Sequence, residues 1–149
     1  MTINSKEQQM DDFFNHYGDV FNKAVRGDRP DIEQTAELFS PCFVAANPLG
    51  VNCGQNNEAF RDAMKKGYEF YKKIGITSMD IVSKKTTILD DLHTMVKVRW
   101  KSSFLKRDGL RGSIEFENIY FIQTRDIQHK VFAYITGDEQ AALKEAGLI

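Results

Sequence analysis

The sequence predicts an α+β domain in which a curved antiparallel sheet wraps around N-terminal helices. Three observations predict this class. Apolar residues recur at helical spacing over residues 6–39 and again over 57–74. From residue 95 to residue 135, apolar and polar residues alternate between turn signals, which is typical of half-buried strands. Helices gathered before strands favour α+β over a fold of alternating helices and strands.

The first predicted helix spans residues 6–26 and ends at Gly27, and we expect residues 1–5 to be frayed. Its apolar positions are Met10, Phe13, Phe14, Tyr17, Val20, Phe21 and Ala24. This loose apolar face indicates a helix that lies on a sheet. The side chain of Tyr17 either belongs to the core or reaches a pocket.

Two further helices follow, each with a recognisable start. Asp31 is the expected N-cap of a short second helix, and Gln34 stands where a capping box places its glutamine. Asn56 or Asn57 is the expected N-cap of a longer third helix. Gly75 is the expected end of that helix.

The strands are predicted from alternation and turn residues. In order they are residues 42–46, 51–54, 77–88, 95–104, 114–122 and 131–136, followed by a short helix over 138–147. The first two strands are joined by the turn Asn47-Pro48-Leu49-Gly50. The long hairpin in the middle carries the signal Asp108-Gly109.

The register of the long hairpin decides which residues face the core. A two-residue loop would pair Trp100 with Glu117 and bring a charge into the apolar layer. We therefore expect a three-residue loop over residues 108–110, which pairs Trp100 with Asn118 and Lys101 with Glu117. Asn118 then lies on the apolar face. It contacts a ligand, is hydrogen-bonded to a neighbouring side chain or water, or is turned outward by a bulge.

Composition limits the classes of function. The chain has 149 residues, 42% of them hydrophobic, so one domain over residues 1–149 with a substantial core is expected. The net charge is 20 − 21 = −1, and basic residues form no run, so nucleic acid is not an expected partner. No apolar stretch reaches membrane-spanning length and the N-terminus lacks a signal-peptide pattern, so no membrane is expected.

The two cysteines indicate free thiols. The short hairpin would pair Val44, and not Cys42, with Cys53, so we expect no disulfide. Free thiols suit a cytoplasmic protein.

Sequence spacing offers no metal or cofactor site. The three histidines, His16, His93 and His129, belong to different predicted elements, and no cluster has metal-ligand spacing. No nucleophile motif or phosphate-binding glycine loop is present. We therefore expect neither metal nor cofactor.

Three stretches, together with the element order, resemble the NTF2-like superfamily over about residues 6–138. They are residues 39–54 with the Asn-Pro-Leu-Gly turn, residues 96–100 with Arg-Trp, and residues 118–135. This superfamily has a cone-shaped, cystatin-like fold and includes ketosteroid isomerases and SnoaL-like polyketide cyclases. The resemblance implies a deep pocket between the concave sheet and the helices, and a homodimer through the sheet.

The resemblance also implies site residues, and two of them depart from the enzymes' pattern. Asn47 stands where the isomerases carry their general base, and Asn118 stands where they carry a second acid. An amide cannot abstract a proton, although it can donate a hydrogen bond to a carbonyl oxygen. The expected pocket residues are Tyr17, Asn47, Trp100, Phe116, Asn118 and Tyr120.

Three functions therefore stay open. The first is binding of a small, mainly apolar molecule in the cone. The second is a SnoaL-like isomerase, cyclase or dehydratase whose base is Glu117, turned inward by a bulge, or His16. The third is an interaction or assembly module. Ile119 and Phe121, on the face opposite the pocket, favour a homodimer in any of the three.

Overall fold

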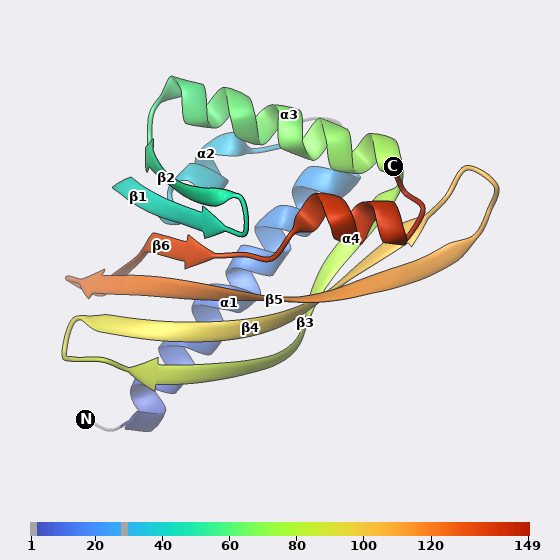
Figure 1. The fold of residues 1–149 in the computed structure, drawn as a ribbon. Helices are drawn as coiled ribbons and strands as arrows, with labels where there is room; N and C mark the ends of the chain where they lie inside the picture. Colours follow the sequence, from blue (N-terminus) through green and yellow to red (C-terminus); the bar gives the residue numbers. More distant parts are fainter. Residues whose placement is uncertain (1–2, 28–29) are drawn as a thin grey trace.

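The computed structural model describes residues 3–27 and 30–149 (Figure 1). Its elements are α1 (Ile3–Arg26), α2 (Ile32–Ala36), β1 (Phe39–Asn47), β2 (Gly50–Gln55), α3 (Glu58–Ile74), β3 (Ile76–Ile88), β4 (His93–Leu105), β5 (Arg111–Arg125), β6 (Gln128–Ile135) and α4 (Glu139–Glu145). The order of helices and strands is the predicted one, and the α+β class is confirmed. The segment 1–5, expected to be frayed, lies partly outside the described residues, and α1 begins at Ile3.

The helix ends follow the predicted local chemistry. The Asp31 carboxylate accepts a hydrogen bond from the Gln34 backbone N–H at 3.3 Å, which caps α2. The Asn57 side chain accepts from the Phe60 N–H at 3.0 Å and caps α3. At the end of α3, Gly75 adopts a left-handed backbone with φ of 99°, which a residue without Cβ accommodates at little cost.

One six-stranded sheet contains all the strands, in the order β2-β1-β6-β5-β4-β3. Neighbours are antiparallel except β1 and β6, which are parallel. Figure 1 shows the long strands β3, β4 and β5 curving past α1. In this view α3 lies above the β1–β2 hairpin, and α4 lies beside the end of β6. The parallel pair was not predicted, because a short apolar run carries no signal of its partner strand.

The loop of the β4–β5 hairpin corrects the predicted register. The three-residue loop comprises residues 107–109, and not 108–110. A three-residue hairpin loop places its last residue in the left-handed region. Gly109 occupies that position with φ of 89°. The predicted loop would have placed Leu110 there, where a side chain with Cβ is strained.

The correction shifts every pair by two residues. The observed pairs include Trp100 with Phe116, Val98 with Asn118, Val96 with Tyr120, Arg99 with Glu117 and Lys101 with Glu115. Because side chains alternate with a period of two, a shift of two leaves each residue on its predicted face. Asn118 therefore still faces inward beside Trp100, although it does not lie directly opposite.

The core fills the space between α1 and the concave face of the sheet. Its buried members are Met10, Phe13, Phe14, Leu38, Phe39, Phe43, Met79, Val96, Val98, Trp100, Tyr120, Ile122 and Val131. Trp100 is fully buried, with no exposed surface. Gly18 of α1 lies against this side chain, and a Cβ at Gly18 would stand 3.5 Å from the Trp100 ring, an ordinary van der Waals distance.

Cys42 and Cys53 are exposed free thiols, and Val44 pairs with Cys53 as predicted. In the part of the chain that the structure describes, no helix combines the length and apolar character needed to span a membrane.

Candidate functional site: an apolar cavity lined by tyrosines

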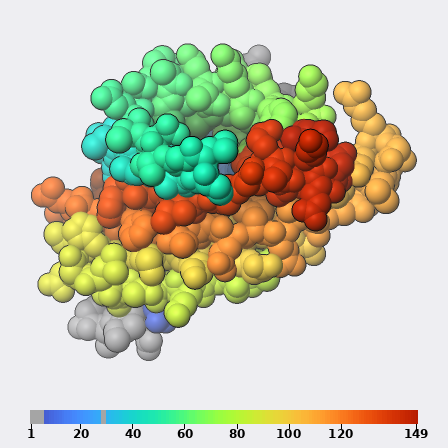
Figure 2. Space-filling view, in the orientation of Figure 1, coloured from blue at the N-terminus to red at the C-terminus, as the bar shows by residue number. Residues whose placement is uncertain are grey.

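A cavity of about 490 Å³ lies between the concave face of the sheet and helices α1, α3 and α4. The space-filling view shows a hollow where α3, the β1–β2 hairpin and α4 meet (Figure 2). Most lining side chains are apolar or aromatic. The polar ones, apart from tyrosines, are Thr35, Ser102, Asn118, Thr136, Asp138 and Glu139. Among the described residues, no lysine, arginine or histidine lines the cavity.

Every tyrosine of the chain lines this cavity. They are Tyr17, Tyr68, Tyr71, Tyr120 and Tyr134. Burial raises the pKa of each of these five hydroxyls above the ordinary value for tyrosine. At neutral pH all five hydroxyls therefore stay protonated and uncharged. The only ionisable side chains of the described lining besides the tyrosines are Asp138 and Glu139.

Two of the tyrosines, both on α3, form hydrogen bonds with side chains of neighbouring helices. The Tyr68 hydroxyl, on α3, lies 2.9 Å from the Thr35 hydroxyl, on α2. The Tyr71 hydroxyl donates to the Glu139 carboxylate, on α4, at 2.6 Å. These bonds join the helices that surround the opening.

A third tyrosine stands at the centre of a buried polar cluster. The Trp100 indole N–H donates to the Tyr120 hydroxyl oxygen, with Nε1 3.0 Å from it. The Asn118 amide donates to the same oxygen, with Nδ2 at 3.1 Å. The Tyr17 ring packs against both, with centroids 5.9 Å from Trp100 and 5.5 Å from Tyr120. Asn118 is thus an asparagine that is bonded to a neighbouring side chain and also lines the cavity.

Four of the six expected pocket residues line the cavity, namely Tyr17, Phe116, Asn118 and Tyr120. Trp100 is not a lining residue. It lies behind Tyr120 and supports the wall through its N–H bond. The polar position expected at Asn118 is therefore present, but its Nδ2 is directed at Tyr120.

Asn47 is placed differently from the expectation. Its side chain is exposed and does not belong to the cavity lining. Its amide oxygen accepts a hydrogen bond from the Leu49 N–H at 2.8 Å. Asparagine commonly closes such a turn by bonding to the backbone two residues on, so local turn chemistry accounts for this residue.

The two candidate bases also lie outside the cavity. His16 is exposed on α1. Glu117 is exposed on the outer face of β5, opposite Arg99, with its carboxylate 4.0 Å from the Lys97 ammonium. The β4–β5 pairing runs without a register shift past Glu117, so the bulge that would turn it inward is not there.

Several lining residues were missed by sequence reasoning. Tyr68 and Tyr71 follow Met64 at helical spacing, a signal that could have assigned them to one face of α3. Tyr134 was missed because apolar residues were expected to alternate along β6 without interruption, which would have placed Tyr134 on the face opposite to Val131. A shift in the β5–β6 register makes Val131 and Tyr134 face the same side, although they are three residues apart.

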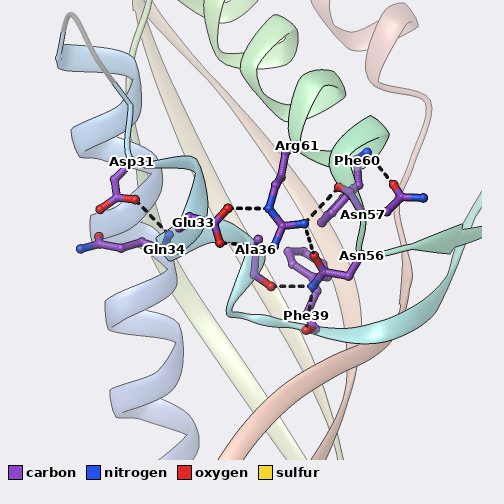
Figure 3. A network of polar contacts seen from close by, with 9 residues as sticks. All are labelled: Asp31, Glu33, Gln34, Ala36, Phe39, Asn56, Asn57, Phe60 and Arg61. Atoms are coloured by element: carbon purple, nitrogen blue, oxygen red, sulfur yellow. Dashed lines mark hydrogen bonds and ion pairs between the residues drawn. The ribbon is translucent and has the colours of Figure 1, made fainter.

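A polar network positions the wall formed by α2, β1 and α3 (Figure 3). The Asn56 amide donates to the carbonyls of Ala36 and Phe39 at 2.8 and 3.1 Å. Arg61 donates to the Asn56 side-chain oxygen at 3.1 Å and also to the Glu33 carboxylate. The hydrogen bond from Arg61 lowers the pKa of that carboxyl.

Metal binding or acid–base chemistry would require clustered or free acidic groups at the cavity. Within residues 3–27 and 30–149, no three histidine, cysteine or acidic side chains are grouped to hold a metal ion. The two acidic residues of the lining are both engaged. Asp138 caps α4 by accepting from the Ala141 N–H at 3.0 Å, and Glu139 accepts from Tyr71.

A curved sheet wrapped around a long N-terminal helix, with an apolar cavity at its wide end, defines the cone-shaped class of NTF2-like proteins. Residues 6–139 match the family described as NTF2-like protein (DUF6841). This match covers most of the chain, and the protein belongs to that family. No curated protein matches the sequence.

Solved structures share the fold at low sequence identity. An NTF2-like protein with a cystatin-like fold from Novosphingobium aromaticivorans has a TM-score of 0.70 and 11% identity, covering 99% of this chain and 90% of that one. An NTF2-like protein from Shewanella oneidensis MR-1 gives 0.67 and 13%, covering 89% and 99%. The association domain of CaMKII from C. elegans gives 0.66 and 13%, covering 89% and 97%. These similarities concern the fold.

Proposed function

We propose that this protein binds a small, uncharged, mainly apolar molecule in the cavity. The observation that carries the proposal is the lining, which is apolar and aromatic with scattered hydroxyls and one amide. The volume of about 490 Å³ is typical of sites for small ligands. An anionic ligand would lose its hydration without gaining an opposite charge, because no basic residue among the described residues lines the cavity, and this is costly.

Gly67 offers a direct test of this proposal. It lies on the face of α3 that Phe60, Met64 and Tyr71 share, and it lines the cavity. A Cβ added at Gly67 meets no heavy atom within 4 Å. Replacing a glycine inside a helix stabilises the helix by up to about 1 kcal/mol. Gly67→Leu is therefore expected to take up part of the cavity at little cost in folding.

The measurement is the binding of fluorene, a neutral tricyclic hydrocarbon, followed by its own fluorescence. The parent protein is expected to bind it saturably, and Gly67→Leu to weaken binding at least roughly tenfold. Gly67→Ala is the matched control, because it shares the helix effect but adds only one methyl group. Absence of saturable binding by the parent, or equal binding by both variants, contradicts the proposal.

We also propose that two copies associate through the outer face of the sheet, which is the second candidate function. An apolar stripe on that face supports it, formed by Val44, Ile119, Phe121, Phe132 and Ile135. Val44 and Ile135 are 39% and 42% exposed. A stripe of this kind on a sheet surface is typical of a covered interface. Among the similar folds is an association domain, that of C. elegans CaMKII.

Light scattering at micromolar concentration tests the association. The parent is expected to have the mass of two chains, and Phe121→Lys the mass of one, because a lysine in the stripe would be buried without a partner. Asp108→Lys, at the tip of the β4–β5 hairpin, adds the same side chain away from the stripe and is expected to stay dimeric. A monomeric parent would contradict the proposal.

A further inference from the structure

The Tyr120 hydroxyl has an unequal balance of donors and acceptors. A tyrosine hydroxyl has one proton to donate and two lone pairs that accept. The Trp100 N–H and the Asn118 amide N–H both donate to this oxygen, at 3.0 and 3.1 Å. Both lone pairs are therefore used, and the Tyr120 proton has to be donated outward.

The Tyr17 hydroxyl is the neighbouring group that could accept this proton, because the Tyr17 and Tyr120 rings pack with centroids 5.5 Å apart and each side chain contributes to the pKa shift of the other. Tyr17 carries a proton of its own. If Tyr120 donates to Tyr17, the Tyr17 proton is left over, and if it does not, the Tyr120 proton is left over. In either arrangement the pair presents a surplus hydrogen-bond donor, and both residues line the cavity.

The charges around this pair limit what can receive the proton. No basic residue among those that line the cavity could balance an anionic ligand. The lining carboxylates belong to Asp138 and Glu139, which already accept hydrogen bonds from an N–H group of α4 and from Tyr71. The surplus donor is thus best matched by a neutral oxygen that accepts hydrogen bonds.

We propose that the ligand carries a neutral carbonyl oxygen, as in a ketone or quinone, and that this oxygen accepts the hydrogen bond of the Tyr17–Tyr120 pair. This inference rests on the proposed function and names the ligand class of the same cavity. Asn118 and Trp100 act as positioning residues, because their N–H groups occupy the Tyr120 oxygen and direct its proton away from them. In this proposal a tyrosine hydroxyl, and not the Asn118 amide, contacts the carbonyl oxygen of the ligand.

A matched pair of probes separates this inference from simple apolar binding. Fluorenone and fluorene have the same three-ring shape and differ by a carbonyl in place of a methylene. Either single variant leaves one hydroxyl with a proton to donate, so the double variant Tyr17→Phe/Tyr120→Phe is the one expected to weaken fluorenone binding, by roughly 3- to 12-fold, the worth of one hydrogen bond. Fluorene affinity should change less than about twofold. Tyr71→Phe removes a hydroxyl bonded to Glu139, and it should change both affinities by the same factor.

Infrared spectroscopy of bound fluorenone gives a readout that does not depend on the stability of a variant. In the parent protein, the carbonyl stretch is expected at lower frequency than in hexane, because a donated hydrogen bond weakens the C=O bond. In the Tyr17→Phe/Tyr120→Phe double variant, which removes both hydroxyls, the frequency should rise toward the hexane value. The spectrum in the parent protein alone decides whether the carbonyl accepts a hydrogen bond, even if the double variant does not fold.

The outcomes separate the two proposals. If both probes bind but the carbonyl stretch of bound fluorenone matches hexane, the carbonyl inference is overturned and apolar binding stands. If fluorenone is preferred and the double variant Tyr17→Phe/Tyr120→Phe keeps that preference, the assignment to Tyr17 and Tyr120 is overturned. If neither probe binds saturably to the parent, the proposed function and this inference fail together.

Discussion

At the scale of single residues, one buried side chain joins the core to the cavity wall. Trp100 is the only tryptophan of the chain, and none of its surface is exposed. Its ring packs on Tyr17, and its N–H is bonded to Tyr120. A buried indole is most stable where its N–H finds an acceptor, and Tyr120 supplies one.

Trp100→Ala is expected to lower the free energy of unfolding by roughly 3–5 kcal/mol. The loss comes from the cavity left by the ring and from the missing donor to Tyr120. Urea denaturation followed by circular dichroism measures it. Lys101→Ala, at an exposed neighbouring position, should change stability by about 0.5 kcal/mol or less. A cost below about 1 kcal/mol for Trp100→Ala would show that the site repacks freely.

The residues of the site were partly predictable. Alternation along β5 placed Asn118 and Tyr120 on the inner face, because their neighbours in the pattern are strongly apolar. Asn47 was misplaced because the resemblance to ketosteroid isomerases put it where they carry their general base, whereas its amide closes the local turn. A residue next to a turn can serve either purpose, and only the three-dimensional path of the chain separates the two.

At the scale of elements, predictions succeeded where local chemistry decides and failed where a partner strand decides. The caps of α2 and α3 and the end of α3 followed from single residues and their spacing. The parallel pairing of β1 with β6 and the register shift near Phe132 depend on contacts between distant segments. Such contacts leave no periodic signal in either strand.

Two glycines with similar backbone angles allow an element-level prediction. Gly75, between α3 and β3, has φ of 99°, and a Cβ there would lie 2.3 Å from the Leu105 carbonyl oxygen. Gly109, in the β4–β5 loop, has φ of 89° and open space around it. Gly109→Ala is expected to cost about 1 kcal/mol of stability, from backbone strain alone. Gly75→Ala should cost at least about 2 kcal/mol, because the clash adds to the strain.

Thermal or urea unfolding of the two variants under identical conditions measures the difference. The Gly109→Ala variant serves as the control for backbone strain. Equal costs for the two substitutions would contradict the prediction. They would mean that the Leu105 carbonyl moves aside freely when a methyl group is added at Gly75.

At the scale of the whole molecule, the cavity is assembled from segments spread along the entire chain. Its tyrosines come from α1, α3, β5 and β6. The sequence identifies the five tyrosines but does not group them, since they share no motif and, apart from Tyr68 and Tyr71 on α3, no spacing. Their common environment nevertheless gives them a common property, a raised pKa caused first by burial.

That property predicts how stability depends on alkaline pH. In the unfolded chain the tyrosines lose their protons near pH 10, whereas in the native protein they keep them to higher pH. Above about pH 10 the unfolded state therefore binds fewer protons, and the free energy of unfolding falls by up to about 1.4 kcal/mol per pH unit for each tyrosine. Below pH 10 this contribution is fully present.

Tyrosinate absorbance near 295 nm and circular dichroism, recorded on the same samples as pH is raised, measure the effect. We expect little tyrosinate in the native protein at pH 10, and then a steep rise that coincides with loss of the folded signal. The chain in urea is the control, and its five tyrosines should titrate gradually near pH 10. If the folded protein instead titrated all five tyrosines near pH 10, water would reach every hydroxyl, and the cavity could not be the apolar site from which its ligand class is inferred.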